Sequence, residues 1–241
     1  MGYVLTISIL GLCILIHESG HLIAAKYAKI PIERFSVGFG PRLFGFRKNE
    51  TEYWLSLIPL GGYVLPLVKD GEDFSRSPLL KRLLFCLGGP MANIMAALIC
   101  MAAVNALGQG ISFSSVLLEP LLELGEFARQ IISVVPALYH NPDKLSGVIG
   151  IVALGGQYAG TDIARLLKFS IFMNVNLAVF NMLPIPPLDG GRIVFYILEN
   201  IYKPLMRLQT PLTVTGWLLM VALLLYTAIA DVGHLIIRAQ V

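Results

Sequence analysis

Four long runs of apolar residues dominate the chain, and most polar side chains fall between them. The runs cover residues 3–28, 83–107, 166–183 and 212–230. Each has close to the roughly 20 residues that a helix needs to cross the hydrocarbon core of a bilayer. The pattern therefore predicts an α-helical, multi-span protein with about four transmembrane helices.

Between the first two runs, residues 32–67 have a different pattern. Short segments rich in β-branched and aromatic residues are separated by Gly and Pro, at residues 32–37, 51–57 and 62–65. This pattern predicts a small membrane-associated β-sheet. Within it, the Gly-Phe-Gly-Pro sequence at residues 38–41 indicates a tight apolar turn, either dipping into the bilayer or lying at the surface.

The segment between the second and third runs, residues 108–165, is less regular. Residues 116–139 mix Leu and Ile with Glu and Arg, which is typical of an amphipathic helix at an interface. Residues 147–160 are apolar and rich in glycine, which favours close packing against a span or re-entry into the membrane. Neither is predicted to cross the bilayer.

Composition agrees with a membrane protein. Of 241 residues, 56% are hydrophobic and only 14% are charged, and the mean hydropathy is +0.74. Soluble domains usually carry about a quarter charged residues. We therefore expect one membrane-embedded domain over residues 1–241, with no separate soluble domain.

The basic residues are concentrated after the first run. Ten of the 18 Lys and Arg residues lie between Lys26 and Arg82, which places this segment on the cytoplasmic side of a cell (inner) membrane. The N-terminus, residues 108–165 and the C-terminus would then lie outside. Because six acidic residues are interleaved with these basic ones, a nucleic-acid partner is not expected.

The first apolar run contains the most informative motif, His17-Glu18-Ser19-Gly20-His21. Ionisable groups at hydrocarbon depth are costly and mark functional sites. Two histidines four residues apart lie on one face of a helix and can bind zinc, while the intervening glutamate can act as a general base. The spacing predicts half of a zinc-hydrolase site, on the cytoplasmic side of the membrane.

A catalytic zinc needs a third protein ligand, and Asp189 is the best candidate. It follows the third run and the three prolines Pro184, Pro186 and Pro187, which break a helix and are tolerated at depth only where the chain lines a cavity. Taken alone, Asp189 is more simply a helix N-cap. Beside a histidine pair that lacks a third ligand, the ligand role is favoured.

Several motifs, taken together and in this order, resemble the site-2 protease family of intramembrane metalloproteases. They are His17–His21 and the segments at residues 35–41, 61–64, 88–93 and 181–191. The resemblance is greatest to the bacterial branch that cleaves membrane-anchored anti-sigma factors. Asn93, in the fourth motif, is expected to form an interhelical hydrogen bond and not to act in catalysis.

The resemblance implies a Zn²⁺ ion bound by His17, His21 and Asp189, with Glu18 as the general base. It also implies that Asn181 and Asn176 hold or polarise the substrate backbone, and that the β segment at residues 33–65 binds the substrate as an added strand. The implied partners are the lipid bilayer and a single-span membrane protein, whose transmembrane segment is the substrate.

Many members of the family carry PDZ domains between the second and third spans. About 58 residues fill that gap here, too few for such a domain. Residues 112–160 or an accessory membrane protein would have to replace it. Two other functions stay open, a membrane metal-ion transporter and a non-catalytic relative that binds membrane helices, although Glu18 argues against the latter.

Overall fold

The computed structural model describes residues 1–67, 74, 77–140 and 147–239. Four of its helices are long and apolar enough to cross a membrane: α1 (Gly2–Tyr27), α2 (Leu79–Gln109), α5 (Ile163–Asn181) and residues Arg207–Asp231 of α7 (Met206–Ala239). These correspond to the four predicted runs, with ends that differ by a few residues. The predicted helical membrane fold with a small sheet is confirmed.

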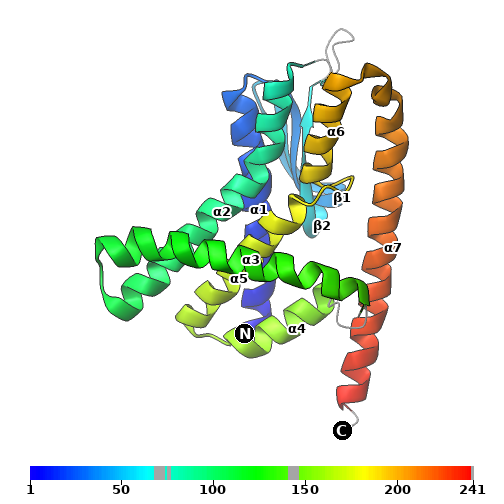
Figure 1. Ribbon diagram of the computed structural model, residues 1–241. Coiled ribbons are helices and arrows are strands. Elements are labelled where there is room, and N and C mark those ends of the chain that lie inside the picture. Colours follow the sequence, from blue (N-terminus) through cyan, green and yellow to red (C-terminus); the bar gives the residue numbers. More distant parts are fainter. Residues whose placement is uncertain (68–73, 75–76, 141–146, 240–241) are drawn as a thin grey trace.

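The helices and the sheet are distributed unequally along the molecule (Figure 1). The sheet and helix α6 (Asp189–Ile201) lie at one end, beside the C-terminal half of α1. Helices α3 (Glu119–His140) and α4 (Val148–Ala159) lie at the other end, near the start of α1. We call the first the metal end and the second the cap end. Single turns at Ser114–Leu118 and Lys203–Leu205 precede α3 and α7.

The sheet consists of β1 (Ile32–Lys48) and β2 (Thr51–Pro66), which contain all three predicted β segments. The first half of β1 has partners on both sides, because residues 34–37 are opposite residues 52–55 and also residues 62–65. The predicted turn at residues 38–41 lies within the range of β1, and the register agrees with it. Residues 34–37 run in the same direction as residues 52–55, whereas residues 44–48 run opposite to residues 51–55, so the chain reverses between them. Gly38 and Gly40 allow this, with φ angles of 89° and 87°.

Helices α1 and α2 cross with their backbones in contact. A Cβ atom on Gly88 would lie 2.5 Å from the carbonyl oxygen of Gly20, and one on Gly20 would collide with the backbone at Gly88. Only glycine allows this approach, which brings α2 against the metal-binding motif of α1. Glycines also allow close packing of α4 at the cap end. Gly155 packs against Thr6 and Phe169, and Gly156 packs against Tyr3.

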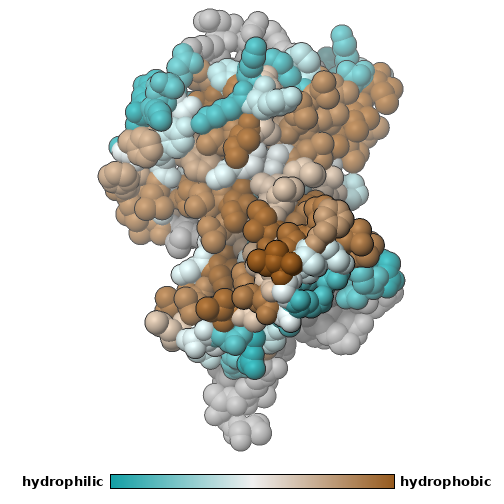
Figure 2. Space-filling model, turned by 90° about the vertical axis from the view of Figure 1, so that its left-hand side faces the viewer, coloured by the Kyte–Doolittle hydropathy of each residue, from teal (hydrophilic) through white to brown (hydrophobic). Residues whose placement is uncertain are grey.

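The surface has the distribution expected of a membrane protein. Figure 2 shows a broad region of hydrophobic side chains between hydrophilic ones at the metal end and others toward the cap end. Many large apolar residues of the spans are exposed, among them Ile23, Ile99, Leu218, Leu219 and Ile229. Such a surface is stable only where lipid or another protein covers it.

Candidate metal centre

Helix α1 brings the two predicted histidine ligands onto one buried face. His17 and His21 are one turn apart, and their rings meet edge to face with centroids 4.8 Å apart. Their Nε2 atoms are 3.2 Å from each other, and both residues are at least 93% buried, with exposures of 7% and 6%. The helix alone therefore supplies two convergent nitrogen donors.

The third donor comes from the start of α6. After α5 ends at Asn181, a proline-containing segment leads to α6, which begins at Asp189. Added Cβ atoms on Gly190 or Gly191 would collide with the backbone of this segment, so the two glycines let α6 start directly against it. The N-cap of α6 is Leu188, without a capping side chain, so Asp189 is not the N-cap.

The three donor atoms form an equilateral triangle. Asp189 Oδ2 lies 3.2 Å from Nε2 of His17 and 3.2 Å from Nε2 of His21, matching the distance between the two nitrogens. A tetrahedral zinc ion with bonds of about 2.0 Å separates its ligands by roughly 3.3 Å. The buried Oδ2 atom has no hydrogen-bond partner. Spacing, donor types and this unsatisfied oxygen all fit a zinc ion.

The charge state of Asp189 also suits a metal. Burial raises the pKa of its carboxyl group, but the adjacent His17 and His21 outweigh burial and hold that pKa below its ordinary value. The lowered pKa favours the ionised carboxylate, which is the form that binds a metal.

Both imidazoles are held through their other nitrogen. His21 Nδ1 lies 2.7 Å from the carbonyl oxygen of Phe85, and His17 Nδ1 lies 2.8 Å from Asn93 Oδ1. Asn93 thus makes the predicted bond between helices, but its partner is a ligand of the candidate metal. A Cβ atom on the neighbouring Gly89 would lie 2.7 Å from the His17 ring, which explains why glycine occupies this position.

A cavity of about 430 Å³ opens onto the three donors. Glu18 lines it, and a Cβ on Gly62 would lie 2.8 Å from Glu18 Cγ, so the glutamate stands against the sheet. The other lining residues come from the sheet, from α2, from the segment around Asp189, and from α7: Phe39, Tyr63, Val64, Phe85, Asn181, Pro187, Leu188, Arg192, Trp217 and Met220.

The two predicted substrate-binding asparagines differ in position. Asn181 lines the cavity and uses one amide hydrogen on the carbonyl of Leu177, at 2.9 Å. Asn176 donates to the carbonyl of Phe172 at 2.7 Å and is not among the residues that line the cavity. The structure thus brings Asn181, but not Asn176, to the metal centre.

Two features near the centre were not anticipated from the sequence. Asn174, completely buried in α5, is hydrogen-bonded to Asn93 at 2.9 Å. Arg82 of α2 forms an ion pair of 3.0 Å with Glu199 of α6 and stacks on Tyr196 with its guanidinium carbon 4.6 Å from the ring centre. The only sequence signal for either is a polar residue within or beside an apolar run.

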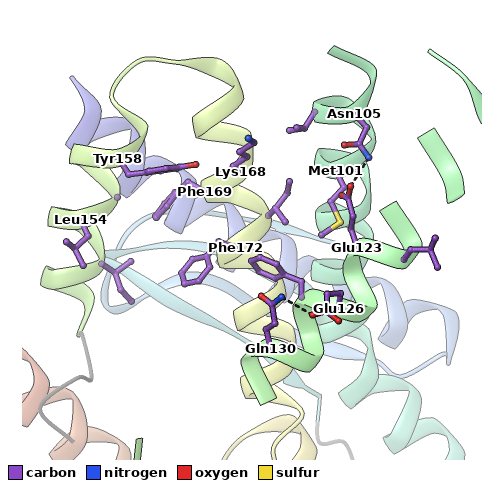
Figure 3. A pocket seen from close by; sticks show the side chains of 16 residues that line it. Met101, Asn105, Glu123, Glu126, Gln130, Leu154, Tyr158, Lys168, Phe169 and Phe172 are labelled. Carbon is purple, nitrogen blue, oxygen red and sulfur yellow. Dashed lines mark hydrogen bonds between the residues drawn. The ribbon is translucent and has the colours of Figure 1, made fainter. Parts of the chain in front are cut away.

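A larger cavity, of about 1080 Å³, lies at the cap end between α2, α3, α4 and α5. Figure 3 shows that Phe169 and Phe172 of α5 reach into it from one side, and Glu123 and Glu126 of α3 lie on another. None of the predicted site residues lines it. It is therefore separate from the metal centre.

The sequence has recognisable relatives. Residues 5–226 match the model of the family described as Peptidase family M50. A protein of Clostridium perfringens named "Putative zinc metalloprotease" is 26% identical over 320 aligned positions, which cover 91% of this chain and 95% of the relative. A Nostoc protein with the same name is 24% identical over 353 positions, covering 98% of this chain and 97% of that protein.

Similarity is higher over a shorter stretch. A Treponema pallidum protein named "Putative zinc metalloprotease" is 36% identical over 123 positions, which cover 44% of this chain and 27% of that protein. The alignments with the Clostridium and Nostoc proteins are longer than the 241 residues of this chain. Those relatives therefore contain residues without a counterpart here, consistent with the absence of a PDZ domain.

Proposed function

The chain belongs to peptidase family M50, the site-2 protease family of zinc metalloproteases, and on this basis we propose that it cleaves the transmembrane segment of a single-span membrane protein. The observation that carries the proposal is the triangle of donors with edges of 3.2 Å, formed partly by a helix that can cross a membrane. A hydrolytic site built into such a helix is suited to a substrate in the same membrane.

His17, His21 and Asp189 would hold the zinc ion. When bound, zinc supplies Lewis-acid chemistry, activating water for attack at neutral pH and polarising the scissile carbonyl. Glu18, in the same cavity, accepts the proton of the attacking water and then donates it to the departing amine. Asn181 has a second amide hydrogen available for the developing oxyanion, a kind of interaction worth about 3 kcal/mol in other hydrolases.

The sheet offers a way to present the substrate. A transmembrane helix hides its carbonyls in internal hydrogen bonds, so it must unwind before hydrolysis. In the described part of the chain, residues 62–65 pair only with residues 34–37, and Gly62, Tyr63 and Val64 line the cavity. Their other edge is suited to an unwound segment, whose main-chain bonds would offset those lost from the helix.

The distribution of charged residues supports one side of the membrane for the metal site. Lys26, at the last turn of α1, lies nine residues beyond His17, about 13 Å along the helix. The concentration of basic residues after it supports a cytoplasmic position for the metal end in the cell (inner) membrane. A substrate cut there would release its cytoplasmic part, as in the cleavage of membrane-anchored anti-sigma factors. We propose a protein of that kind as substrate.

The proposal is tested with the purified full chain in liposomes, together with a single-span reporter. We expect cleavage within the reporter's span, mapped by mass spectrometry, and a loss of about 100-fold or more in the Glu18→Gln variant with zinc retained. Cleavage by Glu18→Gln at the parent rate contradicts the general-base assignment. Zinc transport into the liposomes without cleavage indicates a transporter instead.

The class of substrate is tested in cells. Membrane proteomes of cells with the parent protein and with Glu18→Gln are compared for membrane-anchored fragments that accumulate only in the variant. Accumulation of an anti-sigma factor supports the finer proposal. Accumulation of other single-span proteins alone contradicts it while leaving the peptidase activity intact.

A further inference from the structure

We propose that Asn93 and Asn174 form a relay of two amides that selects the metal-binding tautomer of His17. The proposal rests on the metal site described above and concerns how the protein prepares that site. Zinc binds the ring nitrogen that carries no hydrogen, so His17 must keep its hydrogen on Nδ1 if Nε2 is to bind the metal. Asn174, which lies outside every predicted site, is a positioning residue in this scheme.

The contacts form a continuous chain from α5 to the metal ligand. Asn174 Nδ2 donates to the carbonyl oxygen of Ser170 at 2.9 Å. Asn93 Nδ2 donates to Asn174 Oδ1 at 2.9 Å and to the carbonyl oxygen of Cys13 at 3.2 Å. Asn93 Oδ1 then faces His17 Nδ1 at 2.8 Å. Helices α1, α2 and α5 each supply part of the chain.

The donor and acceptor in each of these hydrogen bonds are determined by the backbone groups at which the series ends. The backbone carbonyls of Ser170 and Cys13 can only accept hydrogen bonds. Asn174 must therefore direct its NH₂ group to Ser170 and its oxygen to Asn93, and Asn93 must direct its own NH₂ group to Asn174 and Cys13. The oxygen of Asn93 is left facing His17, whose Nδ1 has to be the donor.

His21 reaches the same state by a shorter route. Its Nδ1 lies 2.7 Å from the carbonyl oxygen of Phe85, an acceptor that no side-chain substitution removes. Within the described residues, Nδ1 of His17 faces no backbone carbonyl and depends on two side chains. The backbone thus sets the tautomer of His21, whereas two side-chain amides set the same tautomer of His17. Substitution of those amides should therefore change the tautomer of His17 and not that of His21.

Burial makes the relay difficult to explain as packing alone. Asn93 and Asn174 both have 0% exposure, within helices that can cross a membrane. Two amides buried in apolar surroundings are costly unless every polar atom is paired. An interhelical bond by itself stabilises membrane helices by only about 0.6 kcal/mol on average. Orientation of a metal ligand gives these two amides a function.

The first test measures the tautomer in the parent protein without metal. The full chain, labelled with ¹⁵N-histidine, is studied by NMR in detergent, with His17→Gln used to assign the ring signals. We expect His17 to carry a hydrogen on Nδ1, whether or not Nε2 also holds a proton shared with Asp189. A ring without a hydrogen on Nδ1 overturns the proposal, whatever any variant does.

The second test compares zinc affinities, measured by competition with a chelator. Asn93→Leu should lower the affinity by about 10- to 100-fold and Asn174→Leu by about tenfold, each with mixed tautomers at His17. Asn93→Asp keeps an acceptor for Nδ1–H but loses the donor to Asn174 and Cys13, so it should keep the hydrogen of His17 on Nδ1 with a zinc affinity below that of the parent. The matched control is Asn105→Leu, which removes a buried amide of α2 that bonds to Glu123, far along the helix from the metal.

The outcomes distinguish failure of the relay proposal from failure of the proposed peptidase function. Parent-like zinc affinity in both Asn93→Leu and Asn174→Leu, or an equal loss in Asn105→Leu, overturns the relay. Either result leaves the metal site and reporter cleavage standing. A parent protein that binds no zinc overturns the proposed function and the relay with it.

Discussion

At the metal end α1 and α2 meet backbone to backbone at Gly20 and Gly88, whereas at the cap end α2, α3, α4 and α5 surround a cavity of about 1080 Å³. The difference follows from what each end must hold. Three donor atoms converge to within 3.2 Å of one another at the first, so small displacements of a helix would separate them. The second contains no predicted site residue. Close packing therefore fixes the donor positions at the metal end, whereas at the cap end the close contacts of α4 border a cavity.

Among the substitutions that test this comparison, removal of the third donor should cause the largest loss of zinc binding. Asp189→Ala leaves two imidazoles without a carboxylate, and we expect the zinc affinity to fall by more than about 100-fold. Zinc content is measured by elemental analysis of the purified protein.

The control for this change lies outside the metal end. Asp162 caps α5, since its carboxylate accepts from the backbone N–H of Arg165 at 2.8 Å. Asp162→Ala should lower stability by about 1 kcal/mol and leave zinc bound. A full zinc content in Asp189→Ala would rule out its role as a ligand.

Filling the closest contact should have the next largest effect. A Cβ atom at Gly89 would collide with His21 Nε2 and lie 2.7 Å from His17 Nε2. Gly89→Ala should therefore displace α2 or the imidazoles and lower the zinc affinity by at least about tenfold, as other changes next to metal ligands do. Competition with a chelator measures this loss.

The same helix provides a matched substitution at the other end. A Cβ atom at Gly108 would meet nothing within 4 Å. Gly108→Ala should keep the parent zinc affinity and add the better helix propensity of alanine, about 0.5–1 kcal/mol. Equal effects of the two alanines on zinc binding would contradict the contrast between the two ends.

Breaking the ion pair that holds α6 should reduce stability before it affects the metal. Arg82→Met leaves the carboxylate of Glu199, which is 5% exposed, without its partner, at a cost of about 3–5 kcal/mol. Thermal unfolding in detergent measures this loss. The double variant Arg82→Met/Glu199→Leu should recover most of the stability, since no unpaired charge remains. A double variant as unstable as the single one would show that the charges are not the cause.

The smallest effect is expected at the wall of the cap-end cavity. Phe172 is 44% exposed and already borders open space. Phe172→Ala should lower stability by less than about 1 kcal/mol, well below the 3–5 kcal/mol typical of a packed phenylalanine. The thermal midpoint and zinc content are compared with the parent. A loss as large as that of Arg82→Met would mean that this end is packed as tightly as the other.

The local pattern of residues was enough to predict those structural features that depend only on residues close together in the sequence. A long apolar run predicts a span because the bilayer sets its length, and the spacing of His17 and His21 places both on one helical face. The extent of β1 and β2 was underestimated, since strands are lengthened by pairing partners that the local sequence does not show. The reversal at Gly38 and Gly40 could be predicted, because glycine and proline mark a turn locally.

Features that join distant segments were harder to anticipate. Asp189 could be proposed as a ligand only because the two histidines needed a third ligand. The alternative role of Asp189 as a helix N-cap was excluded only by the structure, in which Leu188 is the N-cap of α6. Asn174 and the pair of Arg82 with Glu199 gave no usable signal. Their partners are fixed by how α1, α2, α5 and α6 cross, and residues 81 or 117 positions apart have no periodic relation.

The sequence by itself determined that this protein crosses a membrane, carries two histidines and a glutamate on one apolar helix, and belongs to a family of zinc metalloproteases. These properties follow from hydrophobicity and helical periodicity, which act over a few residues. Only the tertiary structure decided which carboxylate completes the triangle, which side chains orient His17, and where the glycines allow helices to touch. Those depend on contacts between segments far apart in the chain, because three donors meet at one point only after the helices have packed.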